Sequence, residues 1–200
     1  MTSILTFALL RVIMNYYLNR YAFREKIIQD KVSPEVGIVI VIPCHNEPNL
    51  VGALQSLADC VKPNCKVEVI TVINASEKAE ESVIRQNKKT FNDANEWYTT
   101  YLSEITLFSS DSAQEALAMT LHFIEENALP KKHAGVGLAR KIGMDEAAMR
   151  FESINNELSV SPLFLYISWI LLWQPNHFPR LSSFSHFMES CHRESTATLS

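Results

Sequence analysis

The chain has 200 residues, which is enough for one domain or for one domain with an appendage. Hydrophobic residues make up 47% and charged residues 20%, close to the averages of globular proteins, so composition argues against a generally disordered chain. Eighteen Lys and Arg against 22 Asp and Glu give a net charge of −4, with no basic block. Nucleic acid is therefore not an expected partner, because binding its phosphates requires a basic surface.

The first 33 residues predict a helical segment that precedes the main domain. Residues 4–14 are apolar but too short to span a bilayer, and Arg11 interrupts them. No small-residue cleavage site follows, so a signal peptide is not expected. Bulky residues at helical spacing suit a helix that packs on the domain or one that lies on a membrane. We favour packing, because the polar face is not strongly basic.

The next part of the chain alternates strand and helix patterns. The run GIVIVI over 37–42 is typical of a strand buried on both faces of a parallel sheet, and Pro43 is expected to end it. Apolar residues at helical spacing predict a helix over 47–58. The run KVEVITVI predicts a second strand over 66–73, and the charged stretch 77–89 predicts a second helix.

The pattern then becomes less regular. A short strand is predicted at 106–108, and a helix that carries the apolar residues from 116 to 124 follows it. Residues 135–150 predict a glycine-containing turn that runs into a helix. Strands that alternate with helices predict an α/β domain over 34–151, with right-handed crossovers that place helices on both faces of the sheet.

Composition changes sharply near residue 152. All five glycines precede this point, and no aspartate follows Asp145, so the remainder lacks the usual turn chemistry of a compact fold. Residues 158–179 carry no charged side chain, and their core, PLFLYISWILLW, is shorter than the ~20 residues of a spanning helix. This core suits a buried helix, a segment at a membrane interface or an exposed apolar stretch that is a liability for the chain. Residues 152–200 are interpreted as a divergent tail.

Polar residues follow both of the well-defined strands. The sequence PCHNE, residues 43–47, comes after the first strand, and NASE, residues 74–77, comes after the second. In an open α/β sheet, ligands bind beyond the carboxyl ends of the strands, so these residues are candidates to line one crevice. The alternative is that they are only the polar turn residues that strand ends need.

Three motifs resemble the opening of family 2 glycosyltransferases, which have the Rossmann-like GT-A fold. The first is IVIVIPCHNEPNLVGALQSL, where the family has a strand, Pro-x-(Tyr/His)-Asn-Glu and a helix. The second is VEVITVINASE, where the family strand ends near Asp-Asp-Gly-Ser. The third is AGVGLARKIGMDEA, which is similar to the family segment Gly-x-(Ala/Gly)-x-Ala-Arg-Asn-x-Gly. The resemblance covers residues 37–151 and implies the N-terminal half of a GT-A domain, an incomplete fold.

The resemblance implies a nucleotide site. In this site, His45 takes the place of a residue that meets the nucleotide base, by stacking or by a hydrogen bond. Asn74 takes the place of an acid that reads the base, and Arg140 takes the place of an arginine near the diphosphate. The residues implied are Pro43, His45, Asn46, Glu47, Asn74, Ser76, Gly135 and Arg140. In the alternative interpretation, His45 only caps the following helix and Arg140 is a solvated helix residue.

The chain departs from the family pattern where a metal should be held. Family members follow the third motif with a strand ending in Asp-x-Asp, whose carboxylates hold Mg²⁺ or Mn²⁺ on the diphosphate. This sequence contains no Asp-x-Asp, and the later catalytic carboxylate has no clear counterpart, so no metal ligand or catalytic residue is assigned. One hypothesis explains both the missing acids and the changed composition: residues 152–200 come from a reading-frame change or a truncated gene.

The sequence therefore predicts transfer of a sugar from a nucleoside-diphosphate sugar to a hydroxyl of a glycan or lipid carrier, impaired in this chain as it stands. Two alternatives stay open: a non-catalytic nucleotide-binding module, and a membrane-associated interaction protein that docks through residues 158–179. The expected location is the cytoplasm, with peripheral membrane contact under the last alternative.

Overall fold

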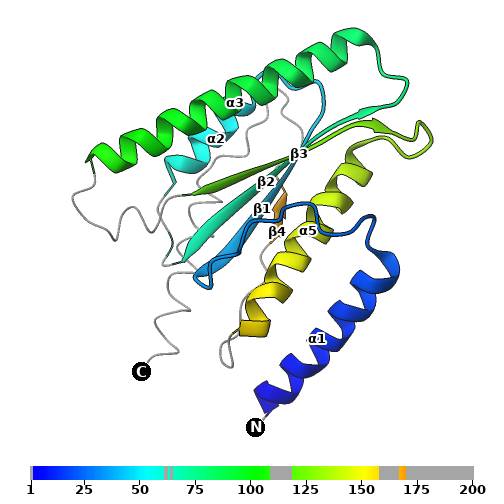
Figure 1. Cartoon of the computed structure of the whole chain (residues 1–200), viewed down its shortest axis with the longest axis vertical. Helices are drawn as coiled ribbons and strands as arrows, with labels where there is room; N and C mark the ends of the chain where they lie inside the picture. The colour runs from blue at the N-terminus through cyan, green and yellow to red at the C-terminus, as the bar shows by residue number, and fades with distance from the viewer. Residues whose placement is uncertain (1, 61–62, 64, 109–118, 158–166, 170–200) are drawn as a thin grey trace.

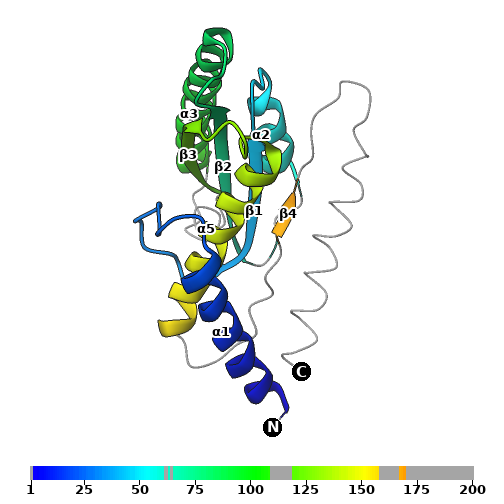
Figure 2. The same cartoon turned by 90° about the vertical axis from the view of Figure 1, so that its right-hand side faces the viewer.

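Figure 1 shows the chain as a computed structural model, in which residues 2–60, 63, 65–108, 119–157 and 167–169 are described. The strands form one parallel sheet, with α2 and α3 over one face and α5, with α1 beside it, over the other (Figures 1 and 2). The elements in chain order are α1 (Thr2–Tyr21), β1 (Val36–Cys44), α2 (Leu50–Ala58), β2 (Lys66–Ser76), α3 (Glu81–Phe108), β3 (Thr120–Leu129), α5 (Val136–Glu157) and β4 (Ile167–Trp169). This arrangement confirms the predicted α/β class and is compatible with a Rossmann-like fold.

The sheet has the strand order β3-β2-β1-β4, and every pairing is parallel. The predicted strand over 37–42 is confirmed, but Pro43 does not end it, because β1 continues to Cys44. Within the described residues, β4 lies only beside Val39–Val41. Pro43 therefore has a described neighbour on one side only, in β2. A strand tolerates proline, which lacks an N–H group, best where one of its sides is not paired.

The side chains of β1 and β2 alternate between two apolar cores, as the pleat of a strand requires. The core under α2 and α3 contains Ile38, Ile40, Ile42, Val69 and Leu54 among others. The core under α5 contains Val39, Val41, Ile70, Val72 and Phe151 among others. Both strands are thus buried on both faces, which explains why their sequences read as continuous apolar runs.

The helix predicted over 116–124 is wrong, because residues 120–129 form β3. Leu121 and Phe123 pack on the α2–α3 side, whereas Ile124 lies in the core under α5. A strand that is covered on both faces carries apolar residues at consecutive positions, so its period of two is hidden from sequence. Pairing with β2 along most of its length then decides the structure, despite residues that favour helices.

The long helix α3 covers the residues of two predicted elements, a helix and a short strand. The helix predicted from residue 77 begins at Glu81 and extends to Phe108, so the short strand predicted at 106–108 is wrong. Trp97 and Tyr101 stack with ring centroids 5.2 Å apart and pack against the core under α2 and α3. These aromatic contacts extend the helix well beyond the charged stretch that the sequence indicated.

Helix α5 approaches the sheet closely at Gly143. A Cβ atom at this position would lie 2.4 Å from Val41 Cγ1 and 3.0 Å from Val72 Cγ2, so only glycine fits without displacement. The turn and helix predicted over 135–150 are confirmed, and the helix continues to Glu157.

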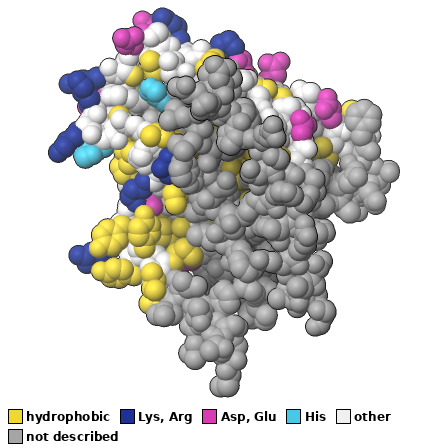
Figure 3. Space-filling model, turned by 180° about the vertical axis from the view of Figure 1, so that it is seen from behind, with side chains coloured by type: hydrophobic (Ala, Val, Ile, Leu, Met, Phe, Trp, Pro, Cys, Tyr) yellow, Lys and Arg dark blue, Asp and Glu magenta, His cyan; other side chains and the backbone are white. Residues whose placement is uncertain are grey.

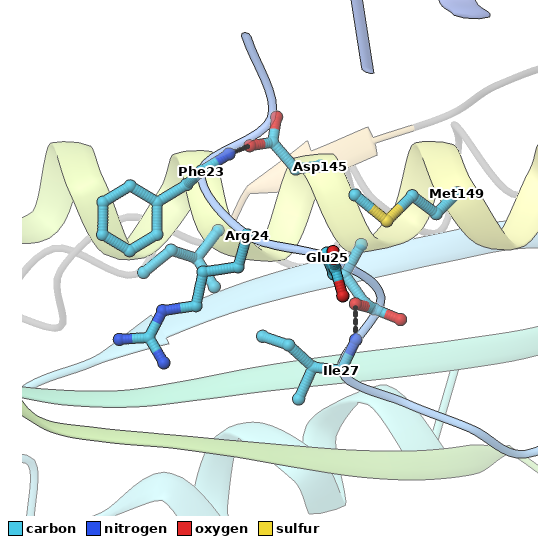
Figure 4. Close-up of a pocket in the computed structure, with 8 residues that line it drawn as sticks. Phe23, Arg24, Glu25, Ile27, Asp145 and Met149 are labelled. Atoms are coloured by element: carbon cyan, nitrogen blue, oxygen red, sulfur yellow. Dashed lines mark hydrogen bonds between the residues drawn. The ribbon is translucent and has the colours of Figure 1, made fainter. Parts of the chain in front are cut away.

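Residues 22–32 attach α1 to the outer side of α5. The Asp145 carboxylate accepts a hydrogen bond from Phe23 N at 2.8 Å, and the Glu146 carboxylate accepts one from Ile27 N at 2.8 Å (Figure 4). Figure 4 shows the small hollow that these side chains line. Two residues of the segment enter the core under α5: Ile28 and Val32. The favoured prediction concerned the N-terminal helix itself, in which Leu18 is buried but Val12 and Ile13 are exposed.

The predicted tail lies mostly outside the described residues, which include only 152–157, as the end of α5, and 167–169, as β4. The proposed boundaries at 33 and 151, and the origin of the tail, stay predictions. Within the described ranges, no helix combines the length and the hydropathy needed to cross a membrane.

Candidate functional site

The carboxyl ends of β1 and β2 lie side by side because Cys44 pairs with Ile73 in the sheet register. The next residues are therefore His45 and Asn74, and His45 Nδ1 lies 2.8 Å from Asn74 O. A carbonyl oxygen only accepts, so Nδ1 carries the proton, and Nε2 of the neutral ring is left as an acceptor. The His45 side chain is exposed, so this second nitrogen and the ring face are open to other molecules.

Asn87 of α3 connects the ends of three strands. Its Oδ1 accepts a hydrogen bond from Asn46 N at 2.9 Å, just after β1. Its Nδ2 donates to Asn74 O of β2 at 3.1 Å and to Asn127 Oδ1 of β3 at 2.9 Å. Asn87 is 1% exposed, and it uses both the carbonyl and the amino group of its amide. The polar group formed by His45, Asn46, Asn74, Asn87 and Asn127 is called the carboxyl-edge cluster below.

The loop after β1 has a left-handed residue at its start. Asn46 has φ = 50°, and it is the one non-glycine residue with positive φ in the described part of the chain. Asparagine tolerates this conformation better than most residues, and the bond to Asn87 holds it in place. The backbone turns sharply here, which carries Glu47 away from the sheet and toward α2.

Glu47 has a local role. Its Oε1 accepts a hydrogen bond from Asn49 N at 2.8 Å, directly before α2, and its backbone oxygen accepts one from the Thr90 hydroxyl at 2.5 Å. Burial raises the pKa of the neighbouring Cys44 thiol to about 12, and the charge of Glu47 adds to this effect. Cys44 is therefore a protonated core residue and not a nucleophile.

The side chain of Asn74 lies on the other face of the sheet from α3. It is 1% exposed, and the strand alternation places it on the same side as Val72, under α5. Its Oδ1 accepts no hydrogen bond from the described residues. A buried amide oxygen without a donor costs about 1–3 kcal/mol, so this atom is the least satisfied point of the carboxyl edge.

The remaining predicted residues lie around this edge in different ways. Pro43 lies inside β1, and Ser76 closes its own turn, with its hydroxyl oxygen accepting from Lys78 N at 3.2 Å. Gly135 precedes α5, and its carbonyl accepts the first helical bond, from Ala139 N at 3.1 Å. Arg140 is half-buried on the first turns of α5, one turn before the contact of Gly143 with the sheet.

The structure thus brings His45, Asn46 and the backbone oxygen of Asn74 together, and it places Arg140 on α5, across the sheet from Asn87 of α3. Helix α5 follows β3 in the chain, so its first turns begin near the carboxyl end of that strand. Arg140 and the Asn74 side chain share the α5 face, whereas Asn87 holds the loop after β1 from the α3 face. A common role for all eight predicted residues stays a prediction.

A second polar group is buried at the amino end of the sheet. Arg150 of α5 binds Glu68 of β2 through two bonds, Nε to Oε2 at 2.5 Å and Nη2 to Oε1 at 2.7 Å. Its Nη2 also donates to His122 Nε2 at 3.2 Å. Burial by itself raises the pKa of Glu68, but the bonds from Arg150, with His122 beside them, outweigh it and lower the pKa to about 2. This bidentate pair fixes the end of α5 on the sheet.

The carboxyl edge does not fit the divalent metal that the resemblance implies. Across the described ranges, no three His, Cys, Asp or Glu side chains are grouped in a way that could hold a metal ion. Two carboxylates adjoin the cluster in sequence. Glu47 accepts a hydrogen bond from Asn49 N at the start of α2, and Glu126, which pairs with Asn74 in the sheet, is bound to Arg24 at 2.8 Å. The donors of the carboxyl-edge cluster are amides and one imidazole, whereas Mg²⁺ in proteins is usually held through one or two carboxylates.

Sequence reasoning missed Asn87 and Asn127. The signal for Asn87 was present, because it lies on the inward stripe of α3 between Ile84 and Phe91, where an apolar residue is expected. A polar residue on such a stripe needs a buried partner. Asn127 had no comparable signal, because the sequence around it was interpreted as following a helix.

Comparisons of the chain with protein-family models, with curated proteins and with solved structures gave no match. The functional interpretation of the carboxyl edge therefore depends on its own geometry and on the three motifs in the sequence.

Proposed function

We propose that the carboxyl edge of β1 and β2 binds a nucleoside-diphosphate sugar, in a domain related to the donor-binding half of the GT-A glycosyltransferases. The reaction assigned to this fold is sugar transfer to a hydroxyl of a glycan or lipid carrier. The observation that carries the proposal is the contact of 2.8 Å between His45 Nδ1 and Asn74 O. It joins the ends of the first two motifs at the edge where α/β folds bind ligands.

The chemistry of His45 suits a nucleotide base. Its ring is exposed and its orientation is fixed by the bond from Nδ1, so a base can stack on the ring face at little entropic cost. The acceptor nitrogen Nε2 can take a hydrogen bond from an exocyclic amino or ring N–H group. The rigid frame around Asn87 keeps the ring in this position.

A positive group is needed on the other side of such a ligand. Arg140 provides a guanidinium at the start of α5, where the helix dipole also favours an anion. In the proposed arrangement, the base meets His45 and the diphosphate extends toward Arg140.

The transfer itself sets further requirements. The bond between sugar C1 and the diphosphate oxygen breaks, the acceptor oxygen bonds to C1, and the acceptor hydroxyl loses its proton. We assign no described residue to this proton transfer. The proposal for this chain's own residues is therefore donor binding, and turnover is a separate question for experiment.

Calorimetric titration of the full chain with UDP, GDP, CDP and ADP, with and without Mn²⁺, tests the proposal. At least one nucleotide is expected to bind, and His45→Ala is expected to weaken its binding at least ten-fold. His45→Phe keeps a ring that can stack and should retain part of the affinity. Asn95→Ala, an exposed asparagine on the same helix as Asn87, serves as the control and should bind like the wild type.

Two further outcomes separate the classes of function. Turnover of a sugar nucleotide that requires Mn²⁺ indicates an enzyme, whereas metal-independent binding without turnover indicates a nucleotide-binding module. If none of the four nucleotides binds, or if His45→Ala binds as tightly as the wild type, the proposal is wrong.

A further inference from the structure

The hydrogen bonds at the ends of β1 and β2 leave the His45 ring with an acceptor and no donor. Its Nδ1 donates to Asn74 O at 2.8 Å, and that oxygen also accepts from Asn87 Nδ2 at 3.1 Å, so its two lone pairs are occupied. Turning the ring over would place a C–H group against Asn74 O and lose the first bond. The ring therefore presents Nε2, as an acceptor, to a molecule that lies beyond the strand ends.

This acceptor is accessible from outside the fold. His45 is exposed although Cys44 and Asn74 beside it are buried, and no described residue donates to its Nε2. Figure 3 shows that histidine side chains reach the molecular surface. The ring of an ordinary surface histidine turns freely and offers either nitrogen, whereas His45 offers one nitrogen in one direction.

A second acceptor without a donor lies at the same edge. Asn74 follows Ile73, which pairs with Cys44, so Asn74 and His45 are neighbours across the two strands. The Asn74 side chain is 1% exposed, and its Oδ1 accepts no hydrogen bond from the described residues. Buried acceptors in folded proteins are almost always paired, so this one favours a donor that the described residues do not supply. Both remaining atoms accept, and the complementary ligand is therefore one that donates.

We propose that this edge selects a nucleotide whose base carries an exocyclic amino group, an inference that rests on the proposed function above. Cytosine, adenine and guanine carry such a group, whereas uracil has a carbonyl oxygen where cytosine has its amino group. An amino N–H directed at Nε2 of His45 forms a hydrogen bond, but a carbonyl oxygen in that place sets two acceptors against each other.

The ring N–H of uracil is a poorer partner for His45. It lies between two carbonyl oxygens, whose lone pairs repel Nε2 when the N–H group approaches it. A site built around a hydrogen bond rejects an analogue that lacks the donor, because the polar atom of the protein is then left unpaired. His45 is thus a specificity-determining residue of the proposed site.

Calorimetric titration of the full chain with matched nucleoside diphosphates tests this inference. CDP is compared with UDP, and ADP and GDP are compared with IDP, whose base has no amino group. Phosphate and ribose are the same within each comparison, so the ratio of affinities reports the base edge. The tightest binder is expected to be CDP, ADP or GDP, and to bind at least five-fold more tightly than its counterpart.

A variant at the same position removes the acceptor and keeps a ring. His45→Phe is expected to bring the ratio of affinities to about one while part of the binding remains. Asn95→Ala, at an exposed asparagine on α3, is the control and should keep the wild-type ratio. Circular dichroism checks that both variants keep the wild-type fold.

Nuclear magnetic resonance of the wild-type chain gives a measurement that needs no folded variant. With ¹⁵N-labelled histidine, His45 is expected to carry its proton on Nδ1. Adding the tightest-binding nucleotide should shift the resonance of Nε2, because this nitrogen then accepts a hydrogen bond.

The outcomes separate this inference from the proposed function. Base selection is wrong, and the proposed function is unaffected, if UDP or IDP binds most tightly or if the ratio is below five-fold. Base selection is also wrong if His45 carries its proton on Nε2, or if a folded His45→Phe variant keeps the wild-type ratio. If none of the five nucleotides binds, the proposed function is wrong and base selection is wrong with it.

Discussion

A single side-chain amide orders the carboxyl edge of the sheet. Asn87 accepts one hydrogen bond from Asn46 N and donates to Asn74 O and Asn127 Oδ1, so it links α3 to the ends of three strands. Backbone groups at a strand end would otherwise turn to water or stay unpaired. The position of His45 depends on this link, because the residue after it is held in a left-handed conformation.

Removing this amide should destabilise the fold. Asn87→Ala leaves Asn46 N without its partner and takes a donor from two oxygen atoms, and each unsatisfied buried group costs about 1–3 kcal/mol. We expect the free energy of unfolding to fall by about 2–4 kcal/mol in urea denaturation. Asn95→Ala, on the exposed side of α3, should change it by less than about 0.5 kcal/mol. Equal stabilities of the two variants would contradict the role of Asn87.

The pair of Glu68 and Arg150 should make stability depend on pH. The pKa of Glu68 in the fold, about 2, lies below its ordinary value of 4.5, so its contribution is present above pH 4.5 and is lost as the pH falls toward 2. A shift of this size corresponds to about 3 kcal/mol, to order of magnitude. Urea unfolding at pH 7 and pH 2.5 should show a smaller loss of stability in the double variant Glu68→Gln, Arg150→Met than in the wild type.

The control for this pH experiment is Glu104→Gln, because Glu104 is exposed on α3. Its loss of stability between the two pH values should match that of the wild type. If the double variant loses as much stability as the wild type, Glu68 does not carry the acid sensitivity.

At the scale of elements, α5 is positioned by one close contact with the sheet. Alanine at position 143 would place its Cβ 2.4 Å from Val41 Cγ1, in a core where both neighbours are β-branched and stiff. The helix and the two central strands can therefore approach as they do only with glycine there.

Two glycines of α5 should respond to alanine in opposite directions. Gly143→Ala is expected to lower the free energy of unfolding by about 1–3 kcal/mol, because overpacking outweighs the gain in helix propensity. Gly137→Ala, on the first turn of the same helix, meets no atom within 4 Å and should raise it by about 0.5 kcal/mol. Thermal and urea denaturation of both variants measure the difference. Stabilisation by Gly143→Ala would show that α5 lies farther from the sheet.

Strand β3 shows how the sheet decides the structure of an element. Its residues include Leu121, Glu125 and Ala128, which favour helices in isolation. The strand pairs in register with β2 over Thr120–Glu126 and again at Leu129. Parallel pairing joins residues about 50 positions apart in the chain, and no local pattern carries that information.

For the whole molecule, the protection of backbone amides against hydrogen exchange should decrease outward from the two central strands, β1 and β2. Val39, Val41, Val69 and Ile70 are fully buried between the two cores, whereas residues 12–21 of α1 and the end of α3 are mostly exposed. Hydrogen exchange measured by mass spectrometry should therefore be slowest in β1 and β2 and fastest in α1 and the last turns of α3. Uniform protection along the described residues would show that the helices unfold only together with the sheet.

The carboxyl edge was only partly predictable. His45 and Asn74 were identified because each follows an apolar strand, and parallel strands bring such residues to one edge. Asn87 was not identified, because its role depends on how α3 lies across the sheet. Arg140 was expected at the rim of this site, and the structure places it on the first turns of α5; its role beside a diphosphate stays a prediction.

The sequence by itself determined the α/β class, the two central strands and the polar residues at their ends, because continuous β-branched runs and the residues after them are local signals. The tertiary structure decided the third strand, the length of α3 and the partners of Asn87 and Arg150. These features depend on pairing and burial between residues 13 to 82 positions apart, where the free energy of contact with the whole sheet outweighs local preference.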